Sequence, residues 1–300
     1  MTLGILIDDR SFASYADLIG SIDQLPPGLG SAWLGSHQSW DPLTLIAAAG
    51  SRRTDLAFGS GVALSYPQHP VALAMQALTA QAAAGGRFTL GLGTSHQTLL
   101  ERVYGYSAAR PAQHAREYLA VLSPLLRGET AEFHGETLDV SAAVNIPGVP
   151  APRVLLAALG PVMLQVAGSL TDGTIVSWTT PRAIAEHVLP RVTKAAEDAG
   201  RPQPAIVAMV PVCIDDDQEG LRAWAAQRFA GSTTFPNYRA ILARGGAASI
   251  SDAMALGSQA AVLDQLSRLR EAGATEIVVL PIGTSTQIER SITALAGWDG

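Results

Sequence analysis

The chain has 300 residues, of which 48% are hydrophobic and 15% are charged, and its formal net charge is -6. This is enough apolar material for a large core, and the length is compatible with one α/β barrel as well as with two domains. The mild acidity and the lack of a basic patch in the sequence argue against nucleic acids and anionic membranes as partners.

Two residue types occur only once, and each restricts the chemistry. Cys213 is the only cysteine, so internal disulfides and cysteine-rich zinc sites are excluded, and its place in an apolar strand predicts a buried, inert thiol. Lys194 is the only lysine and lies in the polar part of a helical pattern. A phosphate-loop lysine and a Schiff-base lysine are therefore excluded.

The N-terminal segment MTLGILIDDR has neither the basic region nor the cleavage site of a signal peptide. Polar residues, proline and glycine interrupt the alanine-rich runs, so the sequence predicts no membrane-spanning helix. We therefore expect a cytoplasmic protein.

Short apolar runs alternate with helical patterns through the first half of the chain. In the first of these helices, Asp41 is the expected N-cap and Pro42 occupies the first helical position. The next helical pattern opens with Pro70 and closes with Gly85. Strands are expected over residues 3–8, 31–36, 54–64 and 87–93, and helices over 41–52, 69–86 and 110–128.

The pattern changes after residue 128. The segment 131–140 alternates around a His-Gly pair, which predicts a surface hairpin, and a Pro/Gly loop follows it. The alternation of strands and helices then resumes. Strands are expected over 153–159, 172–178, 205–215 and 276–283, and helices over 160–170, 180–200, 219–244 and 258–273.

Eight strands that alternate with helices indicate a parallel sheet covered by helices. The strands are continuous apolar runs, as is typical of strands covered on both faces. We expect an α/β fold of the (β/α)₈ TIM-barrel class, formed by residues 1–300 as a single domain with a small hairpin insertion after the fourth helix. The alternative is a doubly wound open sheet.

The active site of such a barrel lies at the carboxyl ends of its strands. In this sequence those ends carry small, polar and histidine residues, with few carboxylates after the first strand. They are Asp8 and Asp9, Ser36 and His37, residues 65–69 and 93–96, Gly160, Ser177 and Trp178, and residues 281–284.

Two common kinds of site fit this pattern poorly. Both Gly-x-Gly segments lack the third glycine of a Rossmann turn and an acidic residue about 20 positions further on. His37, His69 and His96 follow the second, third and fourth strands and could converge on a metal ion. The paired-histidine motifs of metal sites and an acidic ligand after the eighth strand are absent, so we expect no metal and a local hydrogen bond or pocket wall for each histidine.

Other polar and aromatic residues have simpler interpretations. Adjacent residues on a strand point to opposite faces, so Asp8 and Asp9 are not expected to serve one site as an acid/base pair, and one of them should cap a helix or a turn. Trp178 ends a strand toward the mouth, as a packing lid or as a wall beside a flat ring. His134 and His187 are expected at the surface.

Four segments carry a resemblance to a known family: TDLAFGSGVALSYPQHP, GGRFTLGLGTSHQ, LLAALGPVMLQVAGSLTDGTIVSW and VPVCIDDD. Together they resemble the bacterial luciferase-like oxidoreductases, in particular the branch that uses the deazaflavin coenzyme F-420 and is common in actinobacteria. The resemblance extends over essentially the whole chain. It implies an oxidoreductase that transfers a hydride between the coenzyme and a small organic substrate, while the barrel orients both and excludes water.

The same resemblance implies where the coenzyme binds. A cis peptide bond within the segment 60–62 would lie against the ring, and free backbone N–H groups after Gly160 would bind the phosphate without a lysine. The residues assigned to the coenzyme in this way are Ser60, Gly61, Val62, His69, Gly93, Thr94, Ser95, His96, Gly160, Pro161, Val162 and Trp178.

His37 is the catalytic residue that the resemblance implies. Some deazaflavin dehydrogenases of this superfamily end the second strand with Asp-His, and the histidine acts as a base. Here the pair is Ser36-His37, so the histidine matches and the aspartate does not. Two alternatives stay open, namely an FMN-dependent monooxygenase of the same fold and a flavin-binding barrel without catalysis. The family also makes a homodimer through the early helices an expectation.

Overall fold

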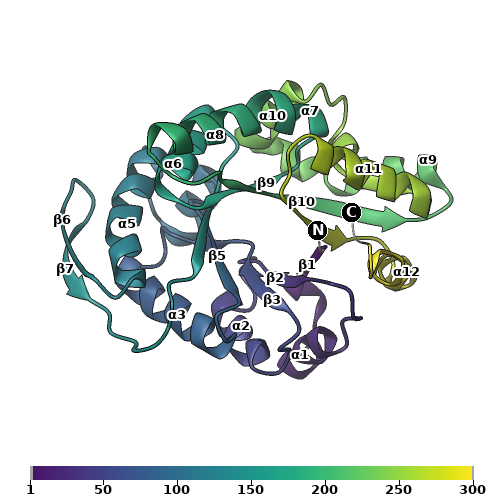
Figure 1. Ribbon diagram of the computed structural model, residues 1–300. Helices are drawn as coiled ribbons and strands as arrows, with labels where there is room; N and C mark the ends of the chain where they lie inside the picture. The colour runs from purple at the N-terminus through teal and green to yellow at the C-terminus, as the bar shows by residue number, and fades with distance from the viewer. Residues whose placement is uncertain (1–2, 299–300) are drawn as a thin grey trace.

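The computed structural model describes residues 3–298, and its central feature is a closed parallel barrel (Figure 1). The last strand of the barrel pairs with the first, which confirms the predicted (β/α)₈ fold and rules out the open sheet. In order around the barrel the strands are β1 (Gly4–Ile7), β2 (Ser31–Leu34), β3 (Ala57–Ser60), β5 (Phe88–Gly93), β8 (Arg153–Ala157), β9 (Gly173–Ser177), β10 (Ala205–Ile214) and β12 (Glu276–Pro281).

Helices surround the barrel on its outer face (Figure 1). Their starts follow the expected local chemistry: Asp41 accepts a hydrogen bond of 2.8 Å from the backbone N–H of Thr44, and Pro42 takes the first position of α2. The longer helices are α1 (Tyr15–Asp23), α2 (Pro42–Gly50), α3 (Pro70–Ala83), α5 (Pro111–Leu126), α6 (Pro161–Leu170), α8 (Leu189–Asp198), α9 (Gln218–Arg228), α10 (Pro236–Arg244), α11 (Gln259–Glu271) and α12 (Ser285–Leu295).

Several parts of the chain differ from the sequence prediction. The third strand is broken into β3 and the short β4 (Ala63–Leu64), and the peptide bond between Gly61 and Val62 is cis, inside the segment where the resemblance placed it. The predicted helix over 180–200 consists of α7 (Pro181–Ala183), a π-helical turn and α8. The sequence analysis did not identify α1, α12, the short strand β11 (Ala255–Gly257) or the short helical segment 97–104.

The predicted hairpin is present after α5, as strands β6 (Thr130–His134) and β7 (Asp139–Ala143), and it projects from one side of the molecule (Figure 1). Glu117 on α5 fixes its turn, because the carboxylate accepts hydrogen bonds from the backbone N–H groups of Glu136 at 3.2 Å and Thr137 at 2.8 Å. None of the helices within residues 3–298 has the length and apolar character to cross a membrane.

The barrel interior is a packed core. Alternate strand residues fill it, including Trp33, which is 1% exposed, together with Leu6, Leu155, Ile175, Val207, Met209 and Val278. Gly59 makes room for the indole, because a Cβ atom at that position would collide with the Trp33 ring. A ligand of this barrel must therefore bind at the mouth, above the side-chain layers.

Candidate active site

A histidine and a buried carboxylate meet at the carboxyl ends of β1 and β2. The Nδ1 atom of His37 lies 2.6 Å from Oδ1 of Asp9. Asp9 is 1% exposed, whereas the His37 side chain is 30% exposed. Because a carboxylate oxygen only accepts, the ring donates through Nδ1 and its Nε2 atom is free for other partners. A histidine–carboxylate pair of this kind can accept and release a proton.

The turn after β1 explains how Asp9 becomes buried. The strand ends at Ile7, and Asp8 caps the short 3₁₀ turn Asp9–Ser11 by accepting from the backbone N–H of Arg10. Asp9 lies inside this turn, so the strict alternation expected for a strand does not apply to the two aspartates. One of them is a cap, as predicted, but the expectation that they lie on opposite faces was wrong.

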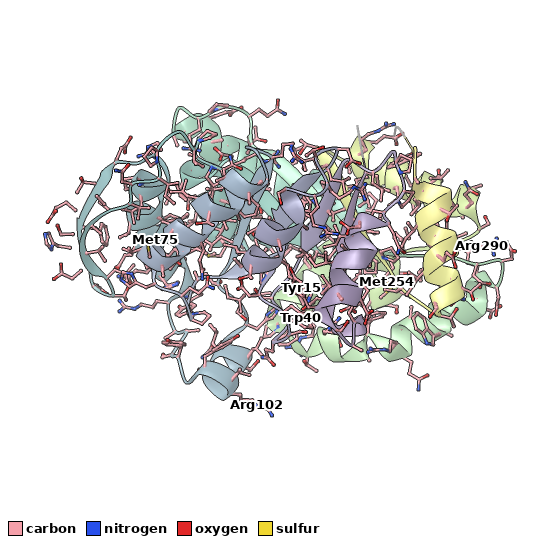
Figure 2. All side chains as sticks on the ribbon, turned by 90° about the horizontal axis from the view of Figure 1, so that it is seen from below. Tyr15, Trp40, Met75, Arg102, Met254 and Arg290 are labelled. Atoms are coloured by element: carbon pink, nitrogen blue, oxygen red, sulfur yellow. The ribbon has the colours of Figure 1, made fainter. Side chains whose placement is uncertain are left out.

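Further contacts hold Asp9 in place. The backbone N–H of Trp40 donates to its second carboxylate oxygen at 3.3 Å. The Trp40 ring in turn packs against Tyr15 at the start of α1, with ring centroids 6.3 Å apart (Figure 2). A carboxylate that accepts two hydrogen bonds keeps its position better than one held by a single contact.

The same cluster has the composition of a metal site, so its geometry matters. One ligand atom each from Asp8, Asp9 and His37 lies within 4.8 Å of the others. However, both oxygens of Asp8 are bound by the guanidinium of Arg10, at 2.7 and 2.9 Å. That ion pair already supplies the positive charge that a metal would bring, and Arg10 lowers the pKa of Asp8 although burial opposes this.

The floor beside His37 is built from glycines. A Cβ atom on Gly35 would lie 2.6 Å from Cε1 of His37 and 2.9 Å from the carbonyl oxygen of Gly61, so these two groups face each other across Gly35. At Gly93 a Cβ atom would strike the side chain of Val62. The structure therefore brings His37, Gly61, Val62 and Gly93 to one part of the mouth, where the glycines leave room for the His37 ring and the Val62 side chain.

Ser60 contributes to this floor only through its position in the strand. Its side chain is fully buried, and the hydroxyl both donates to the carbonyl of Gly91 and accepts from the N–H of Gly91, each at 2.9 Å. Its hydrogen-bonding capacity is thus used inside the sheet. Thr94 and Ser95 follow β5 at the rim, where Ser95 has a left-handed φ of 61°.

The opposite side of the mouth is aromatic. The ring of His96 stacks on Phe235 at 3.9 Å and meets the edge of Tyr238 at 4.8 Å. Trp178 lies 5.5 Å from Phe229 and 6.2 Å from Tyr238, measured between ring centroids. The segment 229–238 therefore supplies three rings to this cover. The sequence analysis missed them because nothing local distinguishes them from helix-packing residues.

His69 does not join His37 and His96. It caps α3, where its Nδ1 atom accepts from the backbone N–H of Val71 at 3.3 Å, and it lines a separate pocket beside the mouth. Each of the three histidines thus has a different partner, and the convergence considered from the sequence does not occur. Within residues 3–298 no three histidines meet the distance criterion for a shared metal.

A free helix N-terminus lies at the end of β8. Gly160 is the N-cap of α6, Pro161 takes the first helical position, and Val162 is 51% exposed. A Cβ atom on Gly160 would meet no atom within 4 Å, and its φ of -86° suits any residue. Open space and unpaired N–H groups at the start of a helix favour an anion.

His187 supports the loop that leads to α6, and the prediction that it lies at the surface was wrong. It is 5% exposed, and its Nε2 atom lies 2.8 Å from the carbonyl oxygen of Leu159. The π-helical turn Ile184–Val188 inserts an extra residue and so rotates His187 toward the interior. Burial lowers its pKa, so the ring is neutral at pH 7.

The remaining residues agree with their predicted roles. Cys213 is fully buried, and burial raises the pKa of its thiol to about 11, which makes it unreactive. His134 is exposed on the hairpin. Lys194 lies on the outer face of α8, where its ammonium group is 2.9 Å from Asp198.

Comparison with known proteins identifies the family. The sequence pattern of the luciferase-like monooxygenases matches residues 17–297. The chain belongs to this family. An uncharacterised protein of Mycobacterium tuberculosis is 29% identical over 238 residues, which cover 73% of this chain and 68% of that protein. The 5,10-methylenetetrahydromethanopterin reductase of Methanopyrus kandleri is 25% identical over 67% of this chain and 62% of its own length.

Solved structures of the family share the fold. The coenzyme F-420-dependent tetrahydromethanopterin reductase of Methanopyrus kandleri superimposes with a TM-score of 0.77 at 19% identity, over 99% of this chain and 97% of that one. A coenzyme F-420-dependent secondary alcohol dehydrogenase gives 0.75 at 16% identity, with both chains covered completely. The oxygenating constituent of 3,6-diketocamphane monooxygenase from Pseudomonas putida, in complex with FMN, gives 0.76 at 17% identity over 99% and 97%.

Proposed function

We propose that this protein is a coenzyme F-420-dependent oxidoreductase that transfers a hydride between the coenzyme and a small organic substrate. The observation that carries the proposal is the pair of Asp9 and His37 at the mouth of a luciferase-like barrel. The names of the reductase and the secondary alcohol dehydrogenase that share the fold support this choice of coenzyme.

The pair can perform the proton transfer that accompanies hydride transfer at an alcohol or carbonyl carbon. When a hydride leaves an alcohol carbon, the hydroxyl proton must also leave, and a positioned imidazole is a suitable base. Asp9 holds Nδ1 of His37 in its protonated form, which leaves Nε2 to take the proton. As the ring becomes positively charged, the buried carboxylate stabilises it. In the reverse direction the same nitrogen returns the proton.

The mouth also has the features that the coenzyme needs. The cis peptide bond between Gly61 and Val62 lies beside His37, where the resemblance places the flat ring, and the N–H groups of Val162 and Met163 are available for the phosphate. When bound, the deazaflavin supplies or accepts the hydride. The aromatic cover of Trp178, Phe235 and Tyr238 would keep water from the reacting atoms.

The first alternative is an FMN-dependent monooxygenase. The fold does not distinguish the two, because the FMN-containing structure superimposes as well as the coenzyme F-420-dependent ones do. The second alternative, a flavin-binding barrel without catalysis, gives no reason to keep a buried carboxylate beside a partly exposed imidazole. Burying a charge has a cost that a structural role could avoid with neutral side chains.

Titration with both coenzymes tests the proposal. Fluorescence should report binding of coenzyme F-420 at least about 10-fold tighter than FMN, which corresponds to about 1.4 kcal/mol. Bound coenzyme should then be reduced or oxidised by one member of a panel of secondary alcohols and ketones. Equal affinities, or tighter binding of FMN, would contradict the assignment, and binding without turnover on any substrate would favour the non-catalytic alternative.

A further inference from the structure

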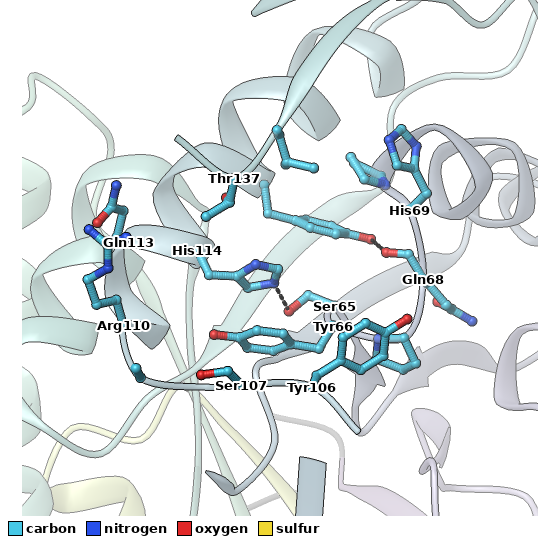
Figure 3. Close-up of a pocket in the computed structure, with 15 residues that line it drawn as sticks. Ser65, Tyr66, Gln68, His69, Tyr106, Ser107, Arg110, Gln113, His114 and Thr137 are labelled. Atoms are coloured by element: carbon cyan, nitrogen blue, oxygen red, sulfur yellow. Dashed lines mark hydrogen bonds between the residues drawn. The ribbon is translucent and has the colours of Figure 1, made fainter. Parts of the chain in front are cut away.

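A pocket of about 470 Å³ lies beside the mouth, outside the site described above. It is enclosed by the start of α3, the segment before α5, α5 itself and the turn of the β6–β7 hairpin (Figure 3). The backbone N–H of Ser65, on its floor, donates to the carbonyl of Gly93 at 2.9 Å. The pocket therefore begins where the short strand β4 leaves the barrel rim, and its size is that of a small-molecule site.

Aromatic rings form much of its wall. Tyr66 stacks on His114 with ring centroids 3.7 Å apart and an angle of 14° between the planes. Tyr106 lies 6.4 Å from Tyr66, and Tyr118 lies 5.5 Å from His114 (Figure 3). These four rings come from two loops and from α5, so the tertiary structure assembles a flat-sided cage that no single segment contains.

Two of the four rings are held by hydrogen bonds. The Nε2 atom of His114 lies 2.9 Å from the hydroxyl of Ser65, which is itself 1% exposed. The hydroxyl of Tyr118 donates to the backbone carbonyl of Gln68 at 3.0 Å. Because His114 and Tyr118 are already held, these two side chains lose little entropy when a ligand binds.

The basic side chains His114 and Arg110 leave no uncompensated charge in the lining of the pocket. Burial lowers the pKa of His114 to about 4, so the imidazole is neutral at physiological pH. The guanidinium of Arg110 is paired with Glu136 at 2.6 Å. Among residues 3–298 no partner is found for the hydroxyls of Tyr66, Tyr106 and Ser107, and Figure 3 shows those of Tyr66 and Ser107 on the same side of the pocket.

We propose that this pocket binds an uncharged, flat aromatic molecule that carries a hydroxyl or carbonyl group, at a site distinct from that of the coenzyme. The ring of such a ligand packs against Tyr66 and Tyr106, and its polar group bonds to the free hydroxyls. The binding step needs no coenzyme, so it can be tested whether or not the proposed redox function is right.

Fluorine NMR with 4-fluorophenol as the probe tests the site on the full chain. The wild-type protein should shift and broaden the fluorine signal in a saturable way. Replacement of Tyr66 by leucine should weaken binding about 10-fold, because a stacking surface and a hydroxyl are both lost. Tyr106→Leu should act in the same direction, and since Tyr106 is 43% exposed this variant should fold normally.

Further controls distinguish binding at this site from nonspecific binding and from binding at the coenzyme site. Tyr104→Leu changes a tyrosine of the same segment that does not line the pocket, and binding should stay as in the wild type. The anion 4-fluorobenzoate should bind at least about 10-fold more weakly than the phenol, because the lining offers no free cation. Saturating coenzyme F-420 or FMN should not displace the phenol.

Several results would overturn the proposal. The first is that the wild-type protein does not bind 4-fluorophenol, and the second is that folded Tyr66→Leu and Tyr106→Leu bind it with unchanged affinity. The third is that Tyr104→Leu weakens binding as much as they do. The fourth is that 4-fluorobenzoate binds as tightly as the phenol or more tightly. Displacement of the phenol by either coenzyme would instead make the pocket part of the coenzyme site.

Discussion

Two regions of the molecule hold a histidine against a buried oxygen, and the oxygen differs. At the mouth, His37 meets the carboxylate of Asp9 at 2.6 Å; in the neighbouring pocket, His114 meets the hydroxyl of Ser65 at 2.9 Å. Asp9 and Ser65 are equally buried, each 1% exposed. A carboxylate stabilises a positively charged imidazole, whereas a hydroxyl does not.

The surroundings reinforce this difference. His114 is stacked on Tyr66, and burial lowers its pKa to about 4, so it serves as a neutral wall. His37 is 30% exposed and faces a floor of glycines. We therefore assign proton transfer to His37, as part of the proposed function, and packing to His114. The comparison shows that the buried group bonded to a histidine, a carboxylate or a hydroxyl, is a better indication of its chemical role than the histidine itself.

The most direct way to break the comparison is to replace each histidine in turn. His37→Asn should lower turnover by about 10²–10⁴-fold, since the proton acceptor is lost. His114→Asn should leave turnover near the wild-type value, because its ring contacts only the pocket. Steady-state kinetics with the best substrate from the alcohol and ketone panel measures both. A larger loss in His114→Asn would reverse the roles that we assign.

Replacing the carboxylate that contacts His37 should have the next largest effect on turnover. Asp9→Asn removes the negative charge and offers an amide donor to Nδ1, which favours the wrong tautomer of His37, and turnover should fall by about 10²-fold. Asp8→Asn is the matched control, because Asp8 is paired with Arg10 and does not contact His37. We expect little change in that variant. Equal losses in the two variants would mean that general charge, rather than the contact to His37, is responsible.

The third test concerns the part of the mouth that lacks a histidine–carboxylate pair. Gly160→Val should weaken coenzyme binding by about 5-fold, or about 1 kcal/mol, by crowding the N-terminus of α6. Thermal stability should be unchanged, since a Cβ atom there meets no neighbour. Gly168→Val, on the same helix, would collide with the backbone of Val192 and should lower the melting temperature. A Gly160→Val protein with normal melting and unchanged affinity would place the phosphate elsewhere.

The last prediction concerns stability rather than turnover or coenzyme binding, and it is a dependence on pH. His114 has an ordinary pKa of 6.5 when unfolded and about 4 when folded, so the folded state binds fewer protons between these values. The free energy of unfolding is therefore unaffected by this group above pH 6.5, and it decreases as the pH falls from 6.5 toward 4. His96 and His187 are shifted in the same direction. For each group the free energy of unfolding can change by at most about 1.4 kcal/mol per pH unit, and the change is smaller for partly exposed rings.

Denaturant unfolding at pH 7 and pH 5 measures this effect. The carboxylates of Asp55 and Glu117 have folded pKa values of about 2, so they lose their contributions only at lower pH and do not interfere. His114→Asn should reduce the difference between the two pH values. A free energy of unfolding that is the same at both would show that the buried histidines accept protons in the folded state.

Local patterns predicted most of the fold. The apolar runs place the eight barrel strands, Asp41 and Pro42 start α2, and the alternation around Gly135 gives the hairpin after α5. These features depend on neighbours in the sequence, on backbone propensities and on which residues need burial. The same information places His37 at the end of the second strand, because the carboxyl end of a strand is fixed by where the apolar run stops.

Tertiary structure decided what each of these residues does. The aspartate missing beside His37 is supplied by Asp9, 28 positions away, because parallel pairing of β1 and β2 brings their ends together. A single inserted residue in a π turn buries His187, and the rings around His96 come from the distant segment 229–238. The sequence alone determined the barrel, the positions of its strand ends and the family to which it is similar. Only the folded chain determined which side chains meet there, because contacts between strand ends and loops depend on closure of the barrel.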